Sequence, residues 1–269
     1  MIPILEAVRV SKFYPRRAGL LRRRIGEVHA VEDVTLALSA GERLGLVGES
    51  GCGKTTLAKL LVGLLAPSAG AVKIQGRSLD ALQGQTLLAA RAVVQFVFQD
   101  PMNSLNPRMT VEQIVSEPLV IHRIGEHSQR RQRAEALLNT VQLPGSHLTR
   151  LPRQLSGGER QRVGIARALA LDPKALICDE PVASLDISIG AQILELLRRL
   201  SAERGMSLLF ISHDLRAVAS LCQRISVMQA GRIVETAPTE QLLDHPAHAY
   251  TQLLLRSAEL DLDAAPSAS

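Results

Sequence analysis

The chain is poor in aromatic residues and in cysteine, and both shortages narrow what it can be. Its 269 residues include no Trp, 2 Tyr, 4 Phe and 3 Cys. Proteins that bind single-stranded nucleic acid place aromatic rings between basic side chains. The basic clusters at 16–24 and 130–133 are therefore expected to be solvated surface, with contact to phosphate or lipid headgroups as the alternative and no nucleic-acid partner. Cys52, Cys178 and Cys222 are far apart and form no CxxC pair, so neither a disulfide framework nor a zinc site is expected.

Long apolar runs and targeting signals are also missing. A membrane-spanning helix needs roughly 20 apolar residues, and the apolar runs of this chain are far shorter. Residues 1–10 have the pattern of a strand and lack the basic start and cleavage site of a secretory signal. Because 46% of the residues are hydrophobic, a buried core can form. A globular cytoplasmic protein is expected.

The spacing of apolar residues changes twice along the chain. β-branched stretches bounded by turn formers predict strands at 4–10, 28–38, 43–47, 71–74 and 93–98. Helical spacing at 111–170 predicts a separate helical lobe, placed at about 108–170. Short apolar runs then alternate with helical stretches, which predicts an α/β fold with a parallel sheet. The Ala-, Ser- and Asp-rich segment 258–269 is expected to be disordered.

A glycine-rich loop lies between an apolar run and a helical run. Residues 48–55 read GESGCGKT, after the apolar residues 44–47 and before the helical stretch 56–65, which is the context of a P-loop. Its amides and helix end would face phosphate oxygens, Lys54 would reach the β and γ phosphates, and Thr55 would ligate Mg²⁺. The predicted ATP-binding residues are Gly48, Ser50, Gly51, Cys52, Gly53, Lys54, Thr55 and Thr56. Cys52 is expected to be a passive filler.

Two adjacent carboxylates follow a second apolar run. Residues 175–180 read ALICDE, a buried strand that ends in Asp179 and Glu180 at the edge where open α/β sheets bind ligands. This is the chemistry of a Walker B strand. Asp179 would hold Mg²⁺, and Glu180 would activate the attacking water as general base.

A second anion-binding helix end is predicted at 155–162, which reads LSGGERQR. Ser156 can cap the helix while Gly157 and Gly158 expose amide groups at its positive end. One chain with a P-loop and a second phosphate site makes sense if two such subunits pair head to tail. Each would then close its serine and glycines over the ATP of the other.

The ordered set of P-loop, LSGGE sequence and Walker B strand closely resembles the nucleotide-binding subunits of ABC transporters, over nearly the whole chain to about residue 255. The resemblance implies a P-loop NTPase fold with a RecA-like core, an antiparallel β subdomain and an inserted α-helical subdomain, within one domain at 1–257. It implies four further site residues. Tyr14 would stack on adenine, Gln99 would contact Mg²⁺ and the membrane interface, Asp186 would be the D-loop aspartate, and His213 would lie near the γ-phosphate.

Two positions depart from the family pattern. Glu159 stands where Gln is usual, and Ala183-Ser184 precedes Leu185-Asp186. Neither changes Ser156 or the two glycines, so activity is expected to survive. Glu180, His213 and Gln99 are the expected catalytic residues.

Other segments resemble the subfamily that energises uptake of dipeptides, oligopeptides and nickel. They are FQDP at 98–101, SLNPR at 104–108, EPL at 117–119, GRIVE at 231–235 and HPAHAYT at 245–251. The stretch between Tyr14 and Val28 resembles the second of two non-identical ATPase subunits. This implies a sister ATPase, two membrane permeases and an external solute-binding protein, with this chain on the cytoplasmic face of the membrane. Peptide importers often have a longer, cysteine-containing C-terminal extension, so its absence favours nickel or a metal chelate. His245 and His248 are expected to belong to the tail pattern and to bind no metal.

The alternatives are other ATP-binding classes. A DNA-repair or chromosome-organising ATPase has the same loop and LSGGE chemistry but needs a long heptad coiled coil, and only about a hundred residues separate Thr55 from Leu155. A translation-associated protein of two fused ATPase units needs a second P-loop. Small-molecule kinases do not explain residues 155–159.

Overall fold

The computed structural model describes residues 2–18, 23–99 and 104–263. It divides into two compact units, which are residues 1–82 with 209–269 and residues 83–208. The second unit is wider than the helical lobe expected at about 108–170, because it also includes two helices and two strands that lie before and after this range.

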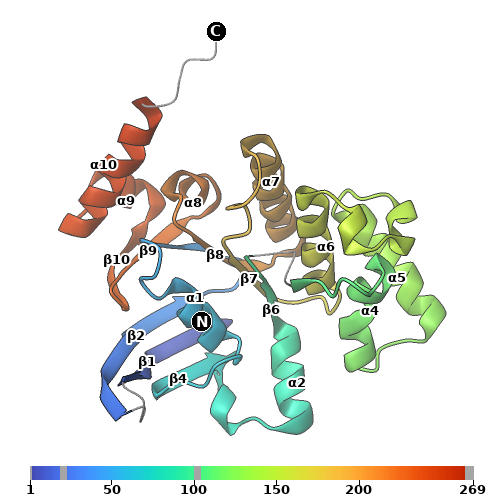
Figure 1. Cartoon of the computed structure of the whole chain (residues 1–269), viewed down its shortest axis with the longest axis horizontal. Helices are drawn as coiled ribbons and strands as arrows, with labels where there is room; N and C mark the ends of the chain where they lie inside the picture. The colour runs from blue at the N-terminus through green and yellow to red at the C-terminus, as the bar shows by residue number, and fades with distance from the viewer. Residues whose placement is uncertain (1, 19–22, 100–103, 264–269) are drawn as a thin grey trace. The chain divides into compact units, whose positions relative to one another are not determined.

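An antiparallel sheet occupies part of the first unit, as expected for the β subdomain (Figure 1). Its strand order is β2-β1-β4-β5, with β1 at Leu5–Ala18, β2 at Arg23–Leu38, β4 at Ala69–Ile74 and β5 at Arg77–Ser78. Leu5 pairs with Leu38 on one side and Ile74 on the other, and all three are buried. Alternate residues of a strand face the same side, so these apolar positions place one face of the sheet in the core.

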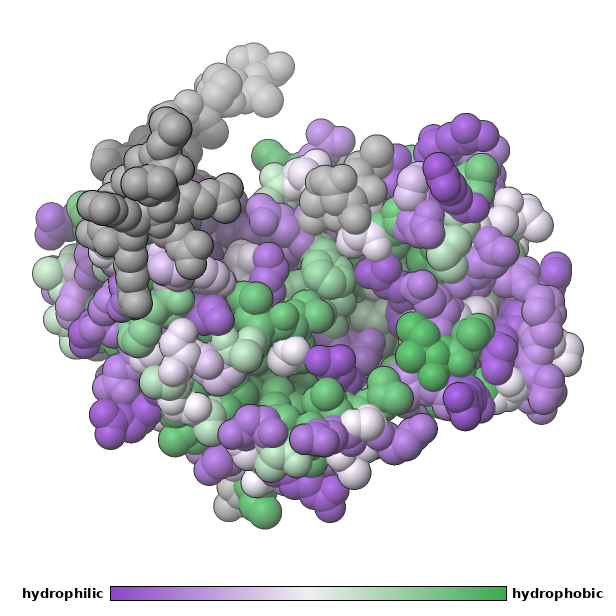
Figure 2. All heavy atoms as spheres, turned by 60° about the horizontal axis from the view of Figure 1, so that its bottom comes forward, coloured by the Kyte–Doolittle hydropathy of each residue, from purple (hydrophilic) through white to green (hydrophobic). Residues whose placement is uncertain are grey.

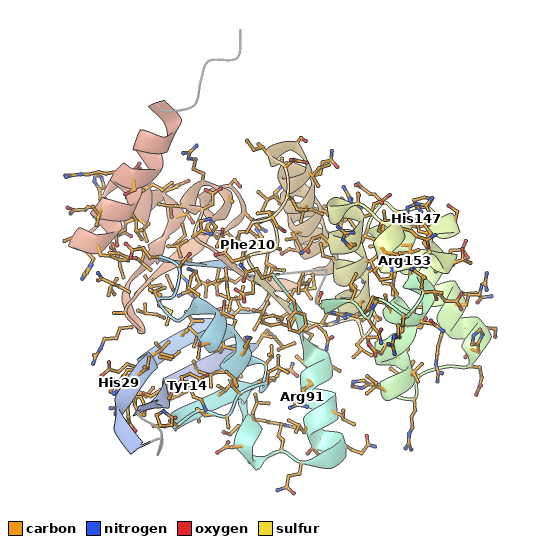
Figure 3. All side chains as sticks on the ribbon, in the orientation of Figure 1. Tyr14, His29, Arg91, His147, Arg153 and Phe210 are labelled. Carbon is orange, nitrogen blue, oxygen red and sulfur yellow. The ribbon has the colours of Figure 1, made fainter. Side chains whose placement is uncertain are left out.

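The P-loop of the first unit follows a strand that is paired in parallel with a neighbour. β3 (Arg43–Val47) is parallel to β9 (Arg224–Gln229), β10 (Arg232–Pro238) is antiparallel to β9, and the strand order is β10-β9-β3-β8, with β8 at Ser207–Ser212. Phe210 in β8 is fully buried (Figure 3). The helices are α1 (Lys54–Leu61), α8 (Leu215–Leu221), α9 (Thr239–Asp244) and α10 (Ala249–Asp263). The P-loop connects β3 to α1, and buried residues of this strand and this helix fix its two ends.

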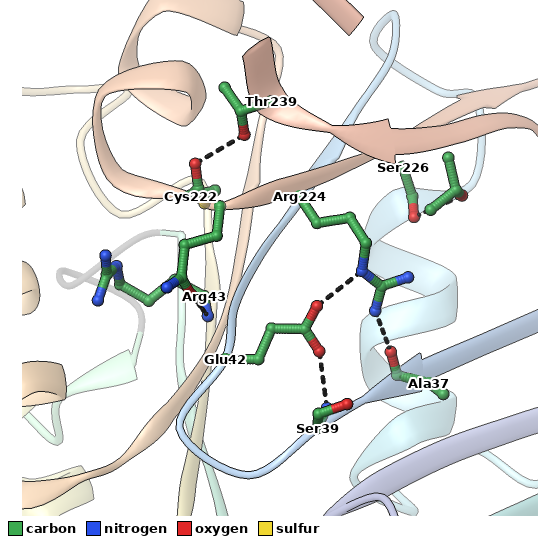
Figure 4. Close-up of polar contacts among 10 residues, drawn as sticks. Ala37, Ser39, Glu42, Arg43, Cys222, Arg224, Ser226 and Thr239 are labelled. Atoms are coloured by element: carbon green, nitrogen blue, oxygen red, sulfur yellow. Dashed lines mark hydrogen bonds and ion pairs between the residues drawn. The ribbon is translucent and has the colours of Figure 1, made fainter. Parts of the chain in front are cut away.

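A polar network joins the two sheets of the first unit (Figure 4). Arg224 of β9 donates through Nε to Glu42 Oε1 at 2.6 Å and through Nη2 to the Ala37 carbonyl of β2 at 2.7 Å. Ser39 N donates to Glu42 Oε2 at 2.8 Å. Burial acts to raise the pKa of Glu42, but the hydrogen bonds from Arg224 and Ser39 outweigh it and hold that pKa below its usual value. The ionised Glu42 therefore fixes β9 against the end of β2.

The second unit contains the predicted helical lobe. Its helices are α2 (Gly84–Val93), α4 (Val111–Ile121), α5 (His127–Thr140), α6 (Gly157–Leu169) and α7 (Ile187–Arg204). Short 3-10 turns lie at Gly145–Thr149 and Pro152–Gln154. α4, α5 and α6 pack on one another (Figure 1). β6 (Val94–Val97) pairs in parallel with β7 (Ala175–Asp179), from Val94–Ala175 to Val97–Cys178.

The expected disordered tail begins inside a helix. α10 runs from Ala249 to Asp263, so residues 258–263 are helical, and 264–269 lie outside the described residues. Ala258, Glu259 and Leu260 are good helix formers, and they extend a helix that starts at buried residues Tyr250 and Thr251. Among residues 2–18, 23–99 and 104–263, no helix has the length and apolar content to cross a membrane.

Candidate nucleotide-binding and catalytic site

The P-loop is packed so closely that two of its residues must be glycine. A Cβ atom on Gly48 would lie 2.1 Å from the Met228 carbonyl oxygen, and one on Gly53 would lie 2.2 Å from the Ala30 carbonyl oxygen. Gly231, in the turn between β9 and β10, donates its amide to the Cys52 carbonyl at 2.8 Å. The loop is therefore held against the middle of β2 and the end of β9.

Lys54 lies at the start of α1 and its side chain folds back over the loop. The residue is only 6% exposed. Its Nζ donates to the Gly48 carbonyl at 2.6 Å and to the Glu49 carbonyl at 3.0 Å. An ammonium group in this position is ready to contact phosphate oxygens bound by the loop. Burial raises the pKa of the half-buried Cys52 thiol, despite the opposing charge of Lys54, which fits the expected passive role of Cys52.

Two other predicted residues belong to the same unit as the P-loop. Tyr14 in β1 is 39% exposed, and Lys12 Nζ lies 5.5 Å from its ring centroid. Figure 3 labels Tyr14 and His29, and the adjacent Phe13 ring lies 4.5 Å from the His29 ring. His213 is exposed and follows β8 directly, and Asp214 then caps α8 by accepting from Arg216 N at 2.9 Å. Tyr14 thus has a partly exposed ring with the Lys12 ammonium over it, and His213 lies between the end of β8 and the N-cap of α8.

The two carboxylates at the end of β7 are buried. Asp179 is 2% and Glu180 is 7% exposed. Glu180 has φ +48°, in the left-handed region that residues with a Cβ rarely adopt and that is frequent at functional sites. Val97, the last residue of β6, pairs with Cys178 of β7. Gln99 lies two residues after Val97, and Glu180 lies two residues after Cys178. Because parallel strands end at the same edge, Gln99 and the two carboxylates lie at one edge of this pair.

The LSGGE helix begins with a reciprocal cap. Ser156 Oγ accepts from the Glu159 amide at 3.3 Å, and Glu159 Oε2 accepts from the Ser156 amide at 2.7 Å. Glu159 Oε1 also lies 3.0 Å from His147 Nε2; Figure 3 shows His147 in the helical lobe. The Ser156 amide, followed by His147, lowers the pKa of Glu159. Glu in place of the usual Gln therefore keeps the cap and gains a histidine partner.

Residues on both sides of Asp186, one before it and one in the helix after it, pack against the two glycines of this cap. A Cβ on Gly158 would lie 2.5 Å from Ile189 Cγ2, and one on Gly157 would lie 3.3 Å from Leu185 Cδ2. Asp186 is the exposed N-cap residue of α7. The predicted site residues thus form two sets, one in each unit: the P-loop, Tyr14 and His213 in the first, and all others in the second.

The sequence did not predict three contacts that lie next to the site residues in the chain. The Tyr250 hydroxyl accepts from the Glu49 amide of the P-loop at 3.0 Å. Arg167 of α6 donates to the Ser104 carbonyl at 2.7 Å and lies 5.9 Å from the Phe98 ring centroid. It therefore contacts the residue before Gln99 and the residue five positions after it. The HPAHAYT segment drew attention to the part of the chain that contains Tyr250, but nothing in the sequence indicated Glu49, its partner 201 residues away.

A family model for the ABC transporter family matches residues 31–183. The chain belongs to the ABC transporter family. It is the ATP-binding and ATP-hydrolysing type of subunit, with the P-loop ABC ATPase fold. The match covers the P-loop, the LSGGE helix and the Walker B strand together.

Curated relatives and solved structures are similar over most of this ABC ATPase. A probable peptide ABC transporter ATP-binding protein, y4tS of Sinorhizobium fredii, is 46% identical over 95% of this chain and 72% of its own length. The oligopeptide transport ATP-binding protein AppF of Bacillus subtilis is 44% identical over 94% of this chain and 78% of its own. A dimeric bacterial ABC transporter cassette, MJ0796, superposes with a TM-score of 0.77 at 31% identity, covering 87% of this chain and 98% of that chain. The same cassette bound to ADP and Pi in a post-hydrolysis state also gives 0.77, at 30% identity over 87% and 98%.

Proposed function

We propose that this ABC ATPase energises the import of dipeptides or oligopeptides. The observation that carries the substrate class is its similarity over almost the whole chain to ATP-binding proteins whose names specify peptides. Glutathione, a tripeptide, is named for a further relative, GsiA of Pectobacterium atrosepticum, which is 44% identical over 94% of this chain and 41% of its own length. Nickel or a metal chelate was the substrate expected from the sequence, but none of these relatives is named for a metal. Peptide is therefore the first substrate to test and nickel the second.

The residues present fit ATP with Mg²⁺. The candidate metal ligands Thr55, Asp179 and Gln99 each carry an oxygen atom, of a hydroxyl, a carboxylate and an amide respectively, and oxygen is the donor type that Mg²⁺ prefers. Mg²⁺ is usually held by one or two carboxylates together with substrate phosphates, and Asp179 is a buried carboxylate at a strand end. When bound, the ion would neutralise charge on the phosphates.

The chain's own residues would carry out the remaining chemistry. Lys54 and the P-loop amides would hold the β and γ phosphates. Glu180 would take a proton from the attacking water, and its strained backbone supports a fixed position for that carboxylate. His213 would contact the γ-phosphate, and the exposed ring of Tyr14 would stack on adenine.

A head-to-tail dimer would complete each site. The P-loop precedes α1 and the LSGGE cap precedes α6, so one chain has two anion-binding helix ends. Ser156, Gly157 and Gly158 would act on the ATP of a sister ATPase, with the exposed Asp186 at the same interface. The similarity to a cassette described as dimeric supports this arrangement.

The helical lobe offers a surface for the membrane permeases on the cytoplasmic face. A groove of about 490 Å³ between α4 and α5 is lined by residues that include Met109, Glu117, Val120 and Ile121. Val120 is 52% and Ile121 is 57% exposed. Figure 2 shows that hydrophobic residues gather in patches on one face of the molecule. Apolar side chains that reach the surface in a groove mark a protein-binding site.

The same groove is linked to the site through Arg167. Burial lowers the pKa of Arg167, and the nearby Glu117 carboxylate, which lines the groove, opposes that shift. Arg167 also holds the Ser104 carbonyl and lies over the Phe98 ring. A displacement of Glu117 in the groove would therefore reach Arg167 of the LSGGE helix and, through it, Phe98 next to Gln99.

Uptake by the native host tests the proposed substrate. A strain that lacks this gene should lose uptake of labelled dipeptides or oligopeptides, and the wild-type gene should restore it. The Glu180→Gln gene, made in equal amounts, should not restore it. Normal peptide uptake together with lost nickel uptake would overturn the peptide proposal and favour nickel.

A further inference from the structure

The HPAHAYT segment at 245–251 is bound to β10 through one carboxylate, that of Glu235. Glu235 of β10 accepts from the Ala247 amide at 2.9 Å, from the His248 amide at 3.0 Å and from the Thr251 hydroxyl at 2.5 Å. Burial acts to raise the pKa of Glu235, but these three donors outweigh it and keep the pKa below its usual value. Glu235 is therefore ionised at neutral pH and fixes the turn before α10.

A histidine completes the turn. His248 Nδ1 accepts from the Tyr250 amide at 3.1 Å, so this nitrogen is used within the segment. Tyr250 is next to Thr251 in the first turn of α10 and is only 6% exposed. Burial raises the pKa of its phenol, which keeps the hydroxyl neutral at physiological pH. The turn thus delivers a buried, neutral hydroxyl to a fixed point.

That point is the peptide group between the first two residues of the P-loop. The Tyr250 hydroxyl accepts from the Glu49 amide at 3.0 Å, and the carbonyl of the same peptide group, that of Gly48, accepts from Lys54 Nζ at 2.6 Å. A trans peptide directs its N–H and C=O to opposite sides. Rotation of this peptide plane would break both bonds, so Tyr250 and Lys54 hold it from its two sides.

We propose that Tyr250 is a positioning residue for ATP, which holds the Gly48–Glu49 peptide group so that Lys54 and the loop are ready for the phosphates. The segment 245–251 is then part of the nucleotide site rather than only a mark of a subfamily. This role rests on ATP binding, which belongs to the family, and not on the transported solute. Its failure would leave the proposed peptide import untouched.

The test is Tyr250→Phe, which removes the hydroxyl and keeps the ring. ATPase kinetics are measured on the full chain in the assembled transporter. KM for ATP should rise about threefold to tenfold, the range for one lost hydrogen bond, while kcat stays within about twofold because the chemical groups are unchanged. The matched control is Ser257→Ala, which removes a hydroxyl of the same helix whose hydrogen bond, among the described residues, is to the Leu253 carbonyl. Its KM should not change.

Hydrogen exchange of the Glu49 amide gives a second readout. The exchange rate in Tyr250→Phe should rise about threefold to tenfold at Glu49 and should be unchanged in β3. Thr251→Val, which removes one bond to Glu235 and keeps the side-chain shape, should raise KM in the same direction by a smaller factor. This variant keeps the proposal testable if Tyr250→Phe fails to fold. An unchanged KM in the folded variants, or equal losses of kcat and thermal stability with no change in KM, would overturn the proposal.

Discussion

Replacing Gly158 with Ala tests whether this glycine is required by packing or by the nucleotide. The new Cβ would lie 2.5 Å from Ile189 Cγ2, so α6 and α7 must move apart or Ile189 must change rotamer. Overpacking of this kind costs about 1–3 kcal/mol. The gain in helix propensity from Gly to Ala offsets at most about 1 kcal/mol of that. The free energy of unfolding should fall by about 0.5–2 kcal/mol, measured by chemical denaturation.

Ile189→Ala in the same chain removes the clash. With Cγ2 gone, the nearest atom to the new Cβ is the Cβ of residue 189, at 3.9 Å, which is an ordinary contact. The two changes should therefore be coupled by about 1–3 kcal/mol in a double-mutant cycle. Stabilities that add to within about 0.5 kcal/mol would refute the packing argument.

The same pair of variants separates packing from phosphate binding. If Gly158 also gives phosphate access to its amide, the double variant should be as stable as Ile189→Ala alone but should still have low ATPase activity. Gly158→Asp, which should prevent closure by placing a carboxylate against the partner's γ-phosphate, meets the same clash. It is therefore informative only in the Ile189→Ala background.

Two other predictions concern the second unit. Arg167→Lys should lose the Ser104 bond and the Phe98 contact, lowering the free energy of unfolding by about 1–3 kcal/mol. It should reduce solute-stimulated ATPase activity more than basal activity, and equal reduction of both would argue against a coupling role. Glu159→Gln should destabilise the chain by about 0.5–1 kcal/mol at pH 7, since the cap loses its charge. Because the folded pKa of Glu159 lies below the usual 4.5 of a glutamate, that stabilisation is present above about pH 4.5 and is lost as the pH falls through the folded pKa. The difference from wild type in denaturation midpoint should shrink there, and a difference that persists would show that the charge is not its source.

Local chemistry made much of the site predictable. The P-loop and the ALICDE strand are contiguous segments whose residue types are dictated by phosphate and metal chemistry. Their flanking apolar runs were enough to place Lys54 at a helix start and Asp179 at a strand end, as the structure has them. The helical lobe was predictable for the same reason, since the spacing within α4, α5 and α6 is a local property.

Contacts between distant segments were not predictable. The bond from Glu49 to Tyr250 spans 201 residues, and the contact of His147 with Glu159 depends on how a 3-10 turn packs on α6. The steric need for Gly158 comes from Ile189 in another helix. No sequence spacing encodes such pairs, because either partner alone is an ordinary core or surface residue. The end of α10 was missed because the composition of a short segment does not show the helix that precedes it.

The most direct test of the account is single-turnover ATP hydrolysis by the Glu180→Gln variant in the assembled transporter, with bound nucleotide measured in the same samples. The account predicts that the variant binds ATP with an affinity close to that of the wild type, because Lys54 and the P-loop belong to the other unit and are unchanged. It also predicts that the hydrolysis rate falls by roughly 10² to 10⁴, the usual cost of losing a general base. Hydrolysis of the bound ATP at a near-normal rate would contradict the central claim that Glu180 activates the attacking water.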